Sequence, residues 1–101
     1  MAGKMLGIMI TKYGNLEHIA GVVRAARKAG HPVAIFMTDE GVKFTRDRKF
    51  IELLSIDGVE VSACVHSCEC GGIQERTDGI NYGSQYDNAG MLHNSERVLV
   101  F

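Results

Sequence analysis

The sequence contains no apolar run near the roughly 18 residues that a membrane-spanning helix needs. Its first ten residues also lack the longer apolar stretch and the small-residue cleavage site of a signal peptide. Eleven basic and twelve acidic side chains leave a formal charge of −1. This balance gives no electrostatic reason to expect nucleic acid or an acidic membrane as a constant partner. We therefore expect a cytoplasmic protein with no direct nucleic-acid or membrane partner.

Cysteine is scarce and confined to one place. The sequence has three cysteines, an odd number, and all of them fall between Cys64 and Cys70. A disulfide-stapled secreted domain spreads its cysteines along the chain, where they close long loops. The clustering instead indicates reactive thiols or a metal site.

The glycine patterns that cradle nucleotide phosphates are missing, because neither GxGxxG nor a Walker A motif occurs. Residues 11–15 precede the first expected helix, whose N-terminus is the place where a phosphate would bind. A tight turn already explains Gly14 in this loop. Nucleotide binding there is kept as an alternative.

The length of 101 residues fits one domain over residues 1–101, and an apolar content of 46% suits a globular core. Apolar runs predict strands at residues 4–10, 33–37, 59–63, 80–82 and 97–101. Helical spacing and capping residues predict helices from Asn15 to Gly30, over 46–56 with Thr45 as the cap, over 67–76, and over 84–94 with Ser84 as the cap. A polar loop is expected at residues 38–41.

Strands that alternate with helices imply βαβ units and a parallel sheet. Right-handed crossovers then place helices on both faces of that sheet. The sequence therefore predicts an α/β fold, a three-layer α/β/α sandwich around a mostly parallel sheet of about five strands. The last helix is expected to draw its apolar positions from Tyr86, Ala89, Met91 and Leu92.

Cys64 is the residue with the clearest chemical position. Ligands of open α/β sheets bind at the carboxyl ends of the strands, and Cys64 follows the strand at residues 59–63, just before a potential helix. A helix N-terminus lowers the pKa of a thiol and favours the nucleophilic thiolate. The alternative from position alone is that Cys64 is a small buried apolar side chain.

Several short motifs carry a family resemblance. The segment Cys64-Val65-His66-Ser67-Cys68-Glu69-Cys70-Gly71-Gly72-Ile73 resembles the active-site stretch of the DsrE/DsrF-like (DsrE/TusD-type) sulfur-relay family. Gly30-His31-Pro32-Val33 with Ile35-Phe36 is similar to that family's AGHxVxxF passage, and Asp39-Glu40-Gly41-Val42 to the loop that follows it. The closing residues 96–101 resemble its C-terminal strand. The similarity covers nearly the whole chain.

The resemblance implies a sulfur carrier of the sulfurtransferase type. Cys64 would accept sulfur as a persulfide and pass it to a partner protein, by exchange chemistry that needs no cofactor. The partners implied are sulfur donor and acceptor proteins, within a homo-oligomer (trimer or hexamer) or a hetero-oligomer. Cys68 lies four residues further on and is a candidate resolving thiol, and His66 is a weaker candidate for a direct role.

The sequence departs from the family pattern at Cys68, Glu69 and Cys70. A carboxylate at Glu69 opposes thiolate formation at Cys64 unless it points away, and Lys12 or His66 could compensate. Two other functions stay open. Cys64, His66, Cys68 and Cys70 are ligand types that suit zinc, although their spacing differs from that of usual structural zinc sites. A non-catalytic regulatory subunit with silent thiols is the second.

Overall fold

Five strands form a single sheet in which every neighbouring pair is parallel, in the order β4-β3-β2-β1-β5. The structure is a computed structural model that describes residues 4–101. Its strands are β1 (Leu6–Ile10), β2 (Val33–Met37), β3 (Val59–Cys64), β4 (Ile80–Gly83) and β5 (Arg97–Val100). All five lie where the sequence predicts strands: β2 has the predicted bounds, and each of the others differs at one end by one or two residues.

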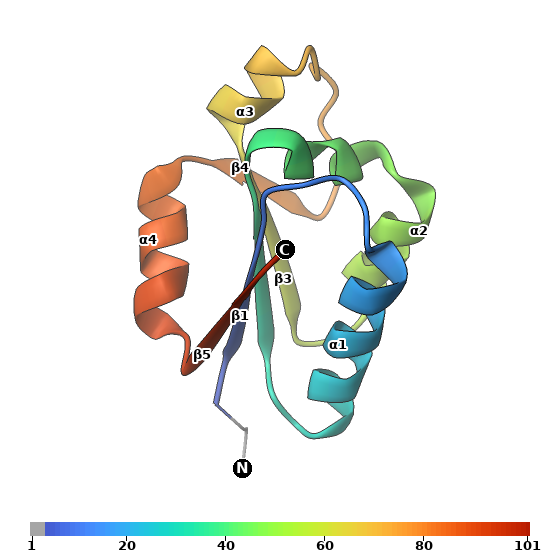
Figure 1. The fold of residues 1–101 in the computed structure, drawn as a ribbon, viewed down its shortest axis with the longest axis vertical. Helices are drawn as coiled ribbons and strands as arrows, with labels where there is room; N and C mark the ends of the chain where they lie inside the picture. Colours follow the sequence, from blue (N-terminus) through green and yellow to red (C-terminus); the bar gives the residue numbers. More distant parts are fainter. Residues whose placement is uncertain (1–3) are drawn as a thin grey trace.

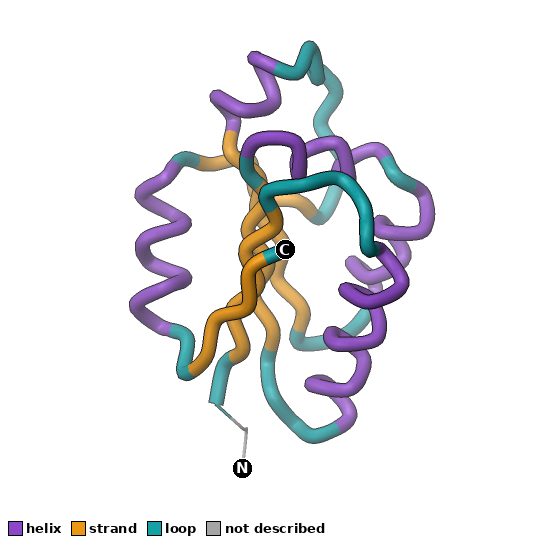
Figure 2. Tube along the Cα trace, viewed as in Figure 1, coloured by secondary structure: helices purple, strands orange, loops and turns teal. Residues whose placement is uncertain are grey.

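The helical elements are α1 (Leu16–Lys28), η1 (Asp39–Arg46), α2 (Arg48–Ile51), η2 (Glu52–Ser55), α3 (Val65–Cys70) and α4 (Gln85–Asn94). Figures 1 and 2 show α1 and α2 on one face of the sheet and α4 on the other, with α3 beyond the edge where β3 ends. The three-layer α/β/α sandwich predicted from the sequence is therefore confirmed.

The core lies between the sheet and the α1 side. Ile8, Ile35 and Val61 are aligned across β1, β2 and β3, and each is buried. Ile19 and Val23 of α1 cover this row. Every residue of the central strand β2 is buried, as its continuous apolar run predicts for a strand covered on both faces.

The first helix has the predicted bounds and the predicted N-cap residue, Asn15, but not the capping hydrogen bond expected of its side chain. Asn15 stands at the N-cap with a left-handed φ of 59°, and its side chain makes no capping hydrogen bond within residues 4–101. Gly30 closes the helix with a φ of 88°. This left-handed conformation favours glycine, as expected for a C′ residue.

The segment between β2 and β3 corrects two expectations. Residues 38–41 are not a loop, because the 3₁₀ helix η1 starts at Asp39. The helix expected at 46–56 is divided into α2 and η2, and its cap is Asp47 instead of Thr45. The reason is local: Thr45 is buried, whereas the Asp47 carboxylate accepts hydrogen bonds from the backbone N–H groups of Lys49 and Phe50.

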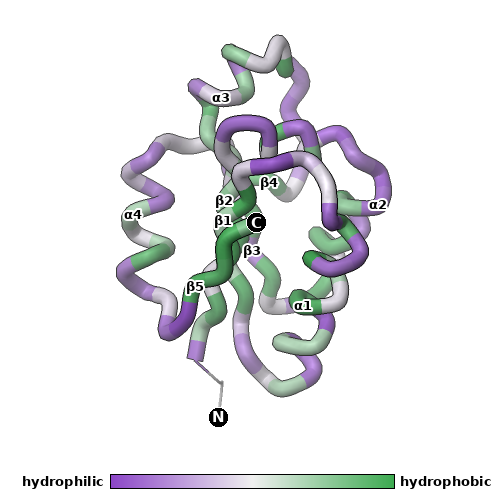
Figure 3. Tube along the Cα trace, in the orientation of Figure 1, coloured by the Kyte–Doolittle hydropathy of each residue, from purple (hydrophilic) through white to green (hydrophobic). Residues whose placement is uncertain are grey.

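The two later helices also differ from expectation. α3 begins at Val65 and ends at Cys70, so the helix expected at 67–76 is shorter and starts earlier; Gly71 and Gly72 follow it. The cap of α4 is as predicted, with Ser84 and Asp87 forming a capping box. Its apolar positions are not, since Tyr86, Ala89 and Leu92 are exposed and Met91 is half-buried. Figure 3 shows mixed hydropathy along this helix.

Within residues 4–101, no helix combines the length and apolar character that crossing a membrane requires.

Candidate active site around Cys64

Cys64 lies at the carboxyl edge of the sheet, opposite Gly83 of the neighbouring strand β4. The chain leaves β3 toward the α1 side, where Ile73 joins the core, and leaves β4 toward α4 on the other face. Such a point, where adjacent connections diverge, is where open α/β sheets bind ligands. A hollow of about 550 Å³ opens here. Its walls come from the loops after three strands and include Thr38, Asp39, Cys64, Ser67 and Gln85.

Hydroxyl and amide groups form a connected network beside the thiol. The Asp39 N–H donates to Ser67 Oγ at 3.0 Å, and Gln85 Nε2 donates to Thr38 Oγ1 at 3.2 Å. The two hydroxyl oxygens, Thr38 Oγ1 and Ser67 Oγ, are 3.3 Å apart. If the Thr38 hydroxyl donates to Ser67 Oγ, the hydroxyl proton of Ser67 is not used in that bond. This proton is then free to point toward Cys64. Every donation in the network then runs toward the sulfur.

The Cys64 thiol is 4% exposed, and burial raises its pKa. The neighbouring polar groups outweigh that effect: Ser67 foremost, then Gln85 and the backbone of His66, leave the pKa of Cys64 below its ordinary value. Donors aimed at one sulfur favour its anion, because they cost nothing to reorganise when the proton leaves. The arrangement therefore favours a thiolate at Cys64.

The other predicted site residues are divided between two environments. Cys68 has no exposed surface and packs in the core, and burial raises its pKa above the ordinary value. Cys70 is exposed, and its Sγ lies 3.6 Å from His66 Nε2. The His66 ring therefore lies toward Cys70. Glu69 lines the hollow beside Cys64, whereas Lys12 does not.

The four residues considered for zinc do not converge. Across residues 4–101, no three His, Cys, Asp or Glu side chains are placed so that they could hold a metal ion. One reason is visible in α3, where Cys68 points into the core while His66 and Cys70 lie at the surface. The single-chain zinc site is therefore not formed.

The fold has a solved counterpart. The crystal structure of the ychN protein from E. coli aligns over 100% of this chain and 100% of its own, with a TM-score of 0.77 and 18% sequence identity. At this identity the likeness to the ychN protein shows the fold alone. No family model matches the chain, and no curated protein matches it either.

Sequence reasoning singled out Cys64 as a candidate but gave no role to the polar groups beside it. Ser67 and Gln85 received no role, although both line the hollow at Cys64 and lower the pKa of its thiol. A signal for Gln85 was present: it directly follows the helix cap Ser84, at the end of the strand predicted over 80–82. Because parallel strands end at the same edge of a sheet, the residue after this neighbouring strand was a candidate for the site.

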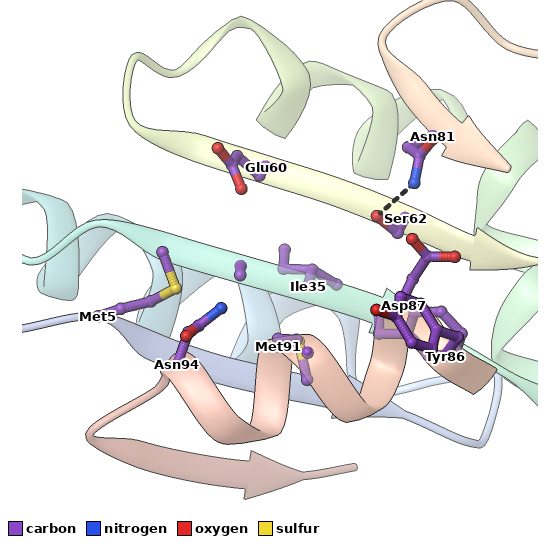
Figure 4. Close-up of a pocket in the computed structure, with 12 residues that line it drawn as sticks. Met5, Ile35, Glu60, Ser62, Asn81, Tyr86, Asp87, Met91 and Asn94 are labelled. Carbon is purple, nitrogen blue, oxygen red and sulfur yellow. Dashed lines mark hydrogen bonds between the residues drawn. The ribbon is translucent and has the colours of Figure 1, made fainter. Parts of the chain in front are cut away.

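A second hollow, of about 340 Å³, lies on the α4 face of the sheet. Figure 4 shows it between α4 and the strands β2, β3 and β4, with Ile35, Glu60, Ser62 and Asn81 on the sheet side and Tyr86 and Asp87 on the helix side. The Asn81 amide donates to Ser62 Oγ at 3.4 Å. Every second residue of a strand faces the same side of the sheet, so Glu60 and Ser62 lie on one face in a polar row that ends at Cys64.

Proposed function

We propose that this protein is a DsrE/DsrF-like sulfur carrier, which accepts sulfur as a persulfide on Cys64 and passes it to a partner protein. One observation carries the proposal: a nearly buried cysteine at the end of β3 borders an open hollow beside the connected polar groups of Thr38, Ser67 and Gln85, and its pKa is lowered. The motifs around Cys64 and at residues 30–42 add support, because they resemble the sulfur-relay family. The fold shared with the ychN protein is compatible with it.

The proposed transfer is an exchange between sulfur atoms. The Cys64 thiolate attacks the terminal sulfur of a donor persulfide, so that a bond from Sγ to this sulfur forms and the donor's S–S bond breaks. The donor sulfur leaves as a thiolate and takes up a proton. In the second half, an acceptor thiolate attacks the terminal sulfur held by Cys64, and Cys64 leaves. No net oxidation occurs, and no cofactor is required.

The hydrogen bonds at Cys64 serve both halves of this exchange. They raise the fraction of thiolate available for attack on the donor persulfide. When Cys64 becomes the leaving group, the Ser67 and Gln85 donors stabilise the negative charge that returns to the sulfur. A leaving thiol with a lowered pKa departs faster. The same groups therefore assist loading and release.

The proposed partners are sulfur donor and acceptor proteins, with self-assembly of this chain as a further part of the proposal. Because Cys64 is nearly buried, a donor must project its persulfide into the hollow instead of meeting the thiol on a flat surface. Cys68 stays a predicted resolving thiol. It has no exposed surface and lies four residues after Cys64.

Intact-mass spectrometry after incubation with inorganic polysulfide tests the proposal. The wild type is expected to gain one sulfur atom, about 32 Da, and reductant should remove it. Cys64→Ser should gain nothing, whereas the matched variant Cys70→Ser should behave as the wild type. An adduct that persists on Cys64→Ser would move the chemistry to another cysteine. Its absence from every variant would sink the sulfur-carrier function and leave the silent-thiol alternative.

A further inference from the structure

The amide of Gln85 can stabilise or oppose a thiolate, depending on which of its two ends faces the sulfur. Its Nε2 group is a donor and its Oε1 atom an acceptor, and the two ends have nearly the same shape. Nε2 donates to Thr38 Oγ1, and Gln85 lines the same hollow as Cys64 and contributes to the lowered pKa of that thiol. Turned by half a rotation, the amide would direct Oε1 at the thiolate and repel it.

Asn88 contacts the oxygen end of the Gln85 amide and so bears on which end faces the sulfur. It lies three residues after Gln85 on α4, and therefore on the same side of the helix. Its Nδ2 group donates to Gln85 Oε1 at 3.2 Å and contacts Met9 Sδ at 3.5 Å. An oxygen that accepts from Asn88 cannot also face Cys64, so Nε2 is left for Thr38 and the thiol.

Asn88 is an unusual residue for its position. It is 8% exposed, whereas the apolar neighbours Tyr86 and Leu92 on the same helix face solvent. Its Oδ1 atom is buried and has no hydrogen-bond partner among the residues that the structure describes. A buried acceptor without a partner destabilises the fold. An apolar side chain at this position would avoid that cost, so stability alone does not account for asparagine here.

We propose that Asn88 is a positioning residue, which holds the Gln85 amide with Nε2, and not Oε1, toward the Cys64 thiolate. This inference rests on the proposed sulfur-carrier function and deepens it, because it extends the site by one residue beyond direct contact with the sulfur. Asn88 acts through Gln85. Its removal should therefore change the reactivity of Cys64 without removing any group that touches it.

The test is a double-mutant cycle on the pH dependence of Cys64 alkylation by iodoacetamide. All proteins carry Cys70→Ser, so that the exposed Cys70 does not react, and peptide mapping assigns the label to Cys64. Asn88→Leu should move the midpoint of the rate to higher pH and reduce the rate at pH 7 by about tenfold, the effect of losing one charge-assisted hydrogen bond. Gln85→Leu should move the midpoint and lower the rate in the same way. The double variant should have the same midpoint and rate as Gln85→Leu alone.

The controls separate positioning from a structural role. Asp39, His66 and Glu69 line the same hollow and Cys68 is buried in the core, but none of these residues is altered, so they are common to every variant. Asn94→Leu, at the exposed end of α4, should leave the midpoint unchanged. If Asn88→Leu does not fold by circular dichroism, Asn88→Ala and the ultraviolet absorbance of the thiolate give the same readout.

The outcomes also separate this inference from the proposed function. An unchanged midpoint in Asn88→Leu, or effects of Asn88→Leu and Gln85→Leu that add, would overturn the positioning role even if Cys64 takes up sulfur. A shifted midpoint and a non-additive cycle would support it even if polysulfide leaves no adduct on the wild type. In that case the orientation of Gln85 stands and the sulfur-carrier function falls.

Discussion

The reactivity of Cys64 depends on the balance between burial and hydrogen bonding. Burial alone disfavours the thiolate, as it does at Cys68, whose pKa is raised. The two cysteines are four residues apart, and what separates them chemically is the set of donors that reaches only one of them. Ser67 is central to that set, because both its hydroxyl and its N–H contribute.

Replacing Ser67 tests this balance. Ser67→Ala removes the hydroxyl but keeps the N–H, so the pKa of Cys64 should rise and less thiolate should be present at neutral pH. Because the lowered pKa makes the wild-type thiolate form at lower pH, the midpoint of alkylation must move upward when a donor is lost. The measurement is the iodoacetamide rate against pH in the Cys70→Ser background. Ser67→Thr, which keeps a hydroxyl, serves as the control, and equal midpoints for alanine and wild type would contradict the prediction.

At this scale the sequence predicts the nucleophile better than its environment. Cys64 could be identified because it follows a buried strand, and the ends of strands are recognisable from hydropathy. The partners of its sulfur could not, since Gln85 is 21 residues away and meets it only through the pairing of β3 with β4. The burial of Cys68 was hidden for a similar reason: residues of a six-residue helix give no periodic signal that separates an inner from an outer face.

Among the elements, α2 depends on a single capping side chain. Asp47 accepts hydrogen bonds from Lys49 N and Phe50 N and also from the Tyr13 hydroxyl at 2.8 Å, and the Tyr13 bond is the main cause of its lowered pKa. Asp47→Ala should reduce the free energy of unfolding by about 1 kcal/mol at neutral pH. Asp47→Asn keeps a capping oxygen, so its free energy of unfolding should fall by less than that of Asp47→Ala.

The effect of Asp47 should also depend on pH. Its folded-state pKa lies below the unfolded-state value, so the carboxylate stabilises the fold above the unfolded pKa. This contribution is lost as the pH falls through the folded-state pKa. Urea unfolding measures the free energy of unfolding of wild type and Asp47→Ala at neutral and at acid pH. The difference between these two free energies should be smaller at acid pH. A difference that stays constant would mean that the charge of Asp47 does not take part.

Two glycines give a matched pair of predictions for the helical elements. A Cβ at Gly41 of η1 would overlap the Ile10 carbonyl at the end of β1, so Gly41→Ala forces the backbone apart. The expected loss in free energy of unfolding is about 1–3 kcal/mol. Gly21 in the exposed face of α1 has open space, and Gly21→Ala should stabilise by about 0.5–1 kcal/mol. Thermal melts of both variants test these two predictions. Equal changes in melting temperature for Gly41→Ala and Gly21→Ala would contradict the close approach at Gly41.

The comparison of these elements explains which of them a sequence specifies. α1 has apolar residues at helical spacing, with charged residues between them, over 13 residues, so its bounds were predictable. η1 is short, and its residues Asp39 to Arg46 are placed by contacts with β1 and α3 that no local pattern encodes. Its start nevertheless matters for the site, because the Asp39 N–H fixes the Ser67 hydroxyl.

For the molecule as a whole, the order of the strands determines where the chemistry is found. The sequence predicts alternating strands and helices, but not that β4 lies at one edge of the sheet and β5 at the other. This order sends α4 across the opposite face and brings its first residue, Gln85, to the end of β3. The position of the site follows from that crossing, whereas its nucleophile follows from the local sequence.

The edge strand β5 leads to the last prediction, which concerns assembly. One edge of β5 pairs with β1, and within residues 4–101 no strand covers the other. Leu99 and Val100 on this strand are 41% and 61% exposed, and Figure 3 shows the strand as strongly hydrophobic. An exposed apolar edge is a template for pairing with another chain. We therefore expect the protein to self-associate through β5.

Val100→Lys places a charge on that edge without disturbing the core, because the side chain it replaces is mostly exposed. Light scattering after size exclusion, at several protein concentrations, should show a smaller assembly for Val100→Lys than for the wild type. Ala25→Lys, an equal change of charge at an exposed position of α1, should leave the assembly intact. A monomeric wild type, or an assembly that Val100→Lys does not weaken, would mean that β5 is a protected edge of a single chain. Any association would then have to use another surface, and the hollow between α4 and the strands β2, β3 and β4 would be the next to test.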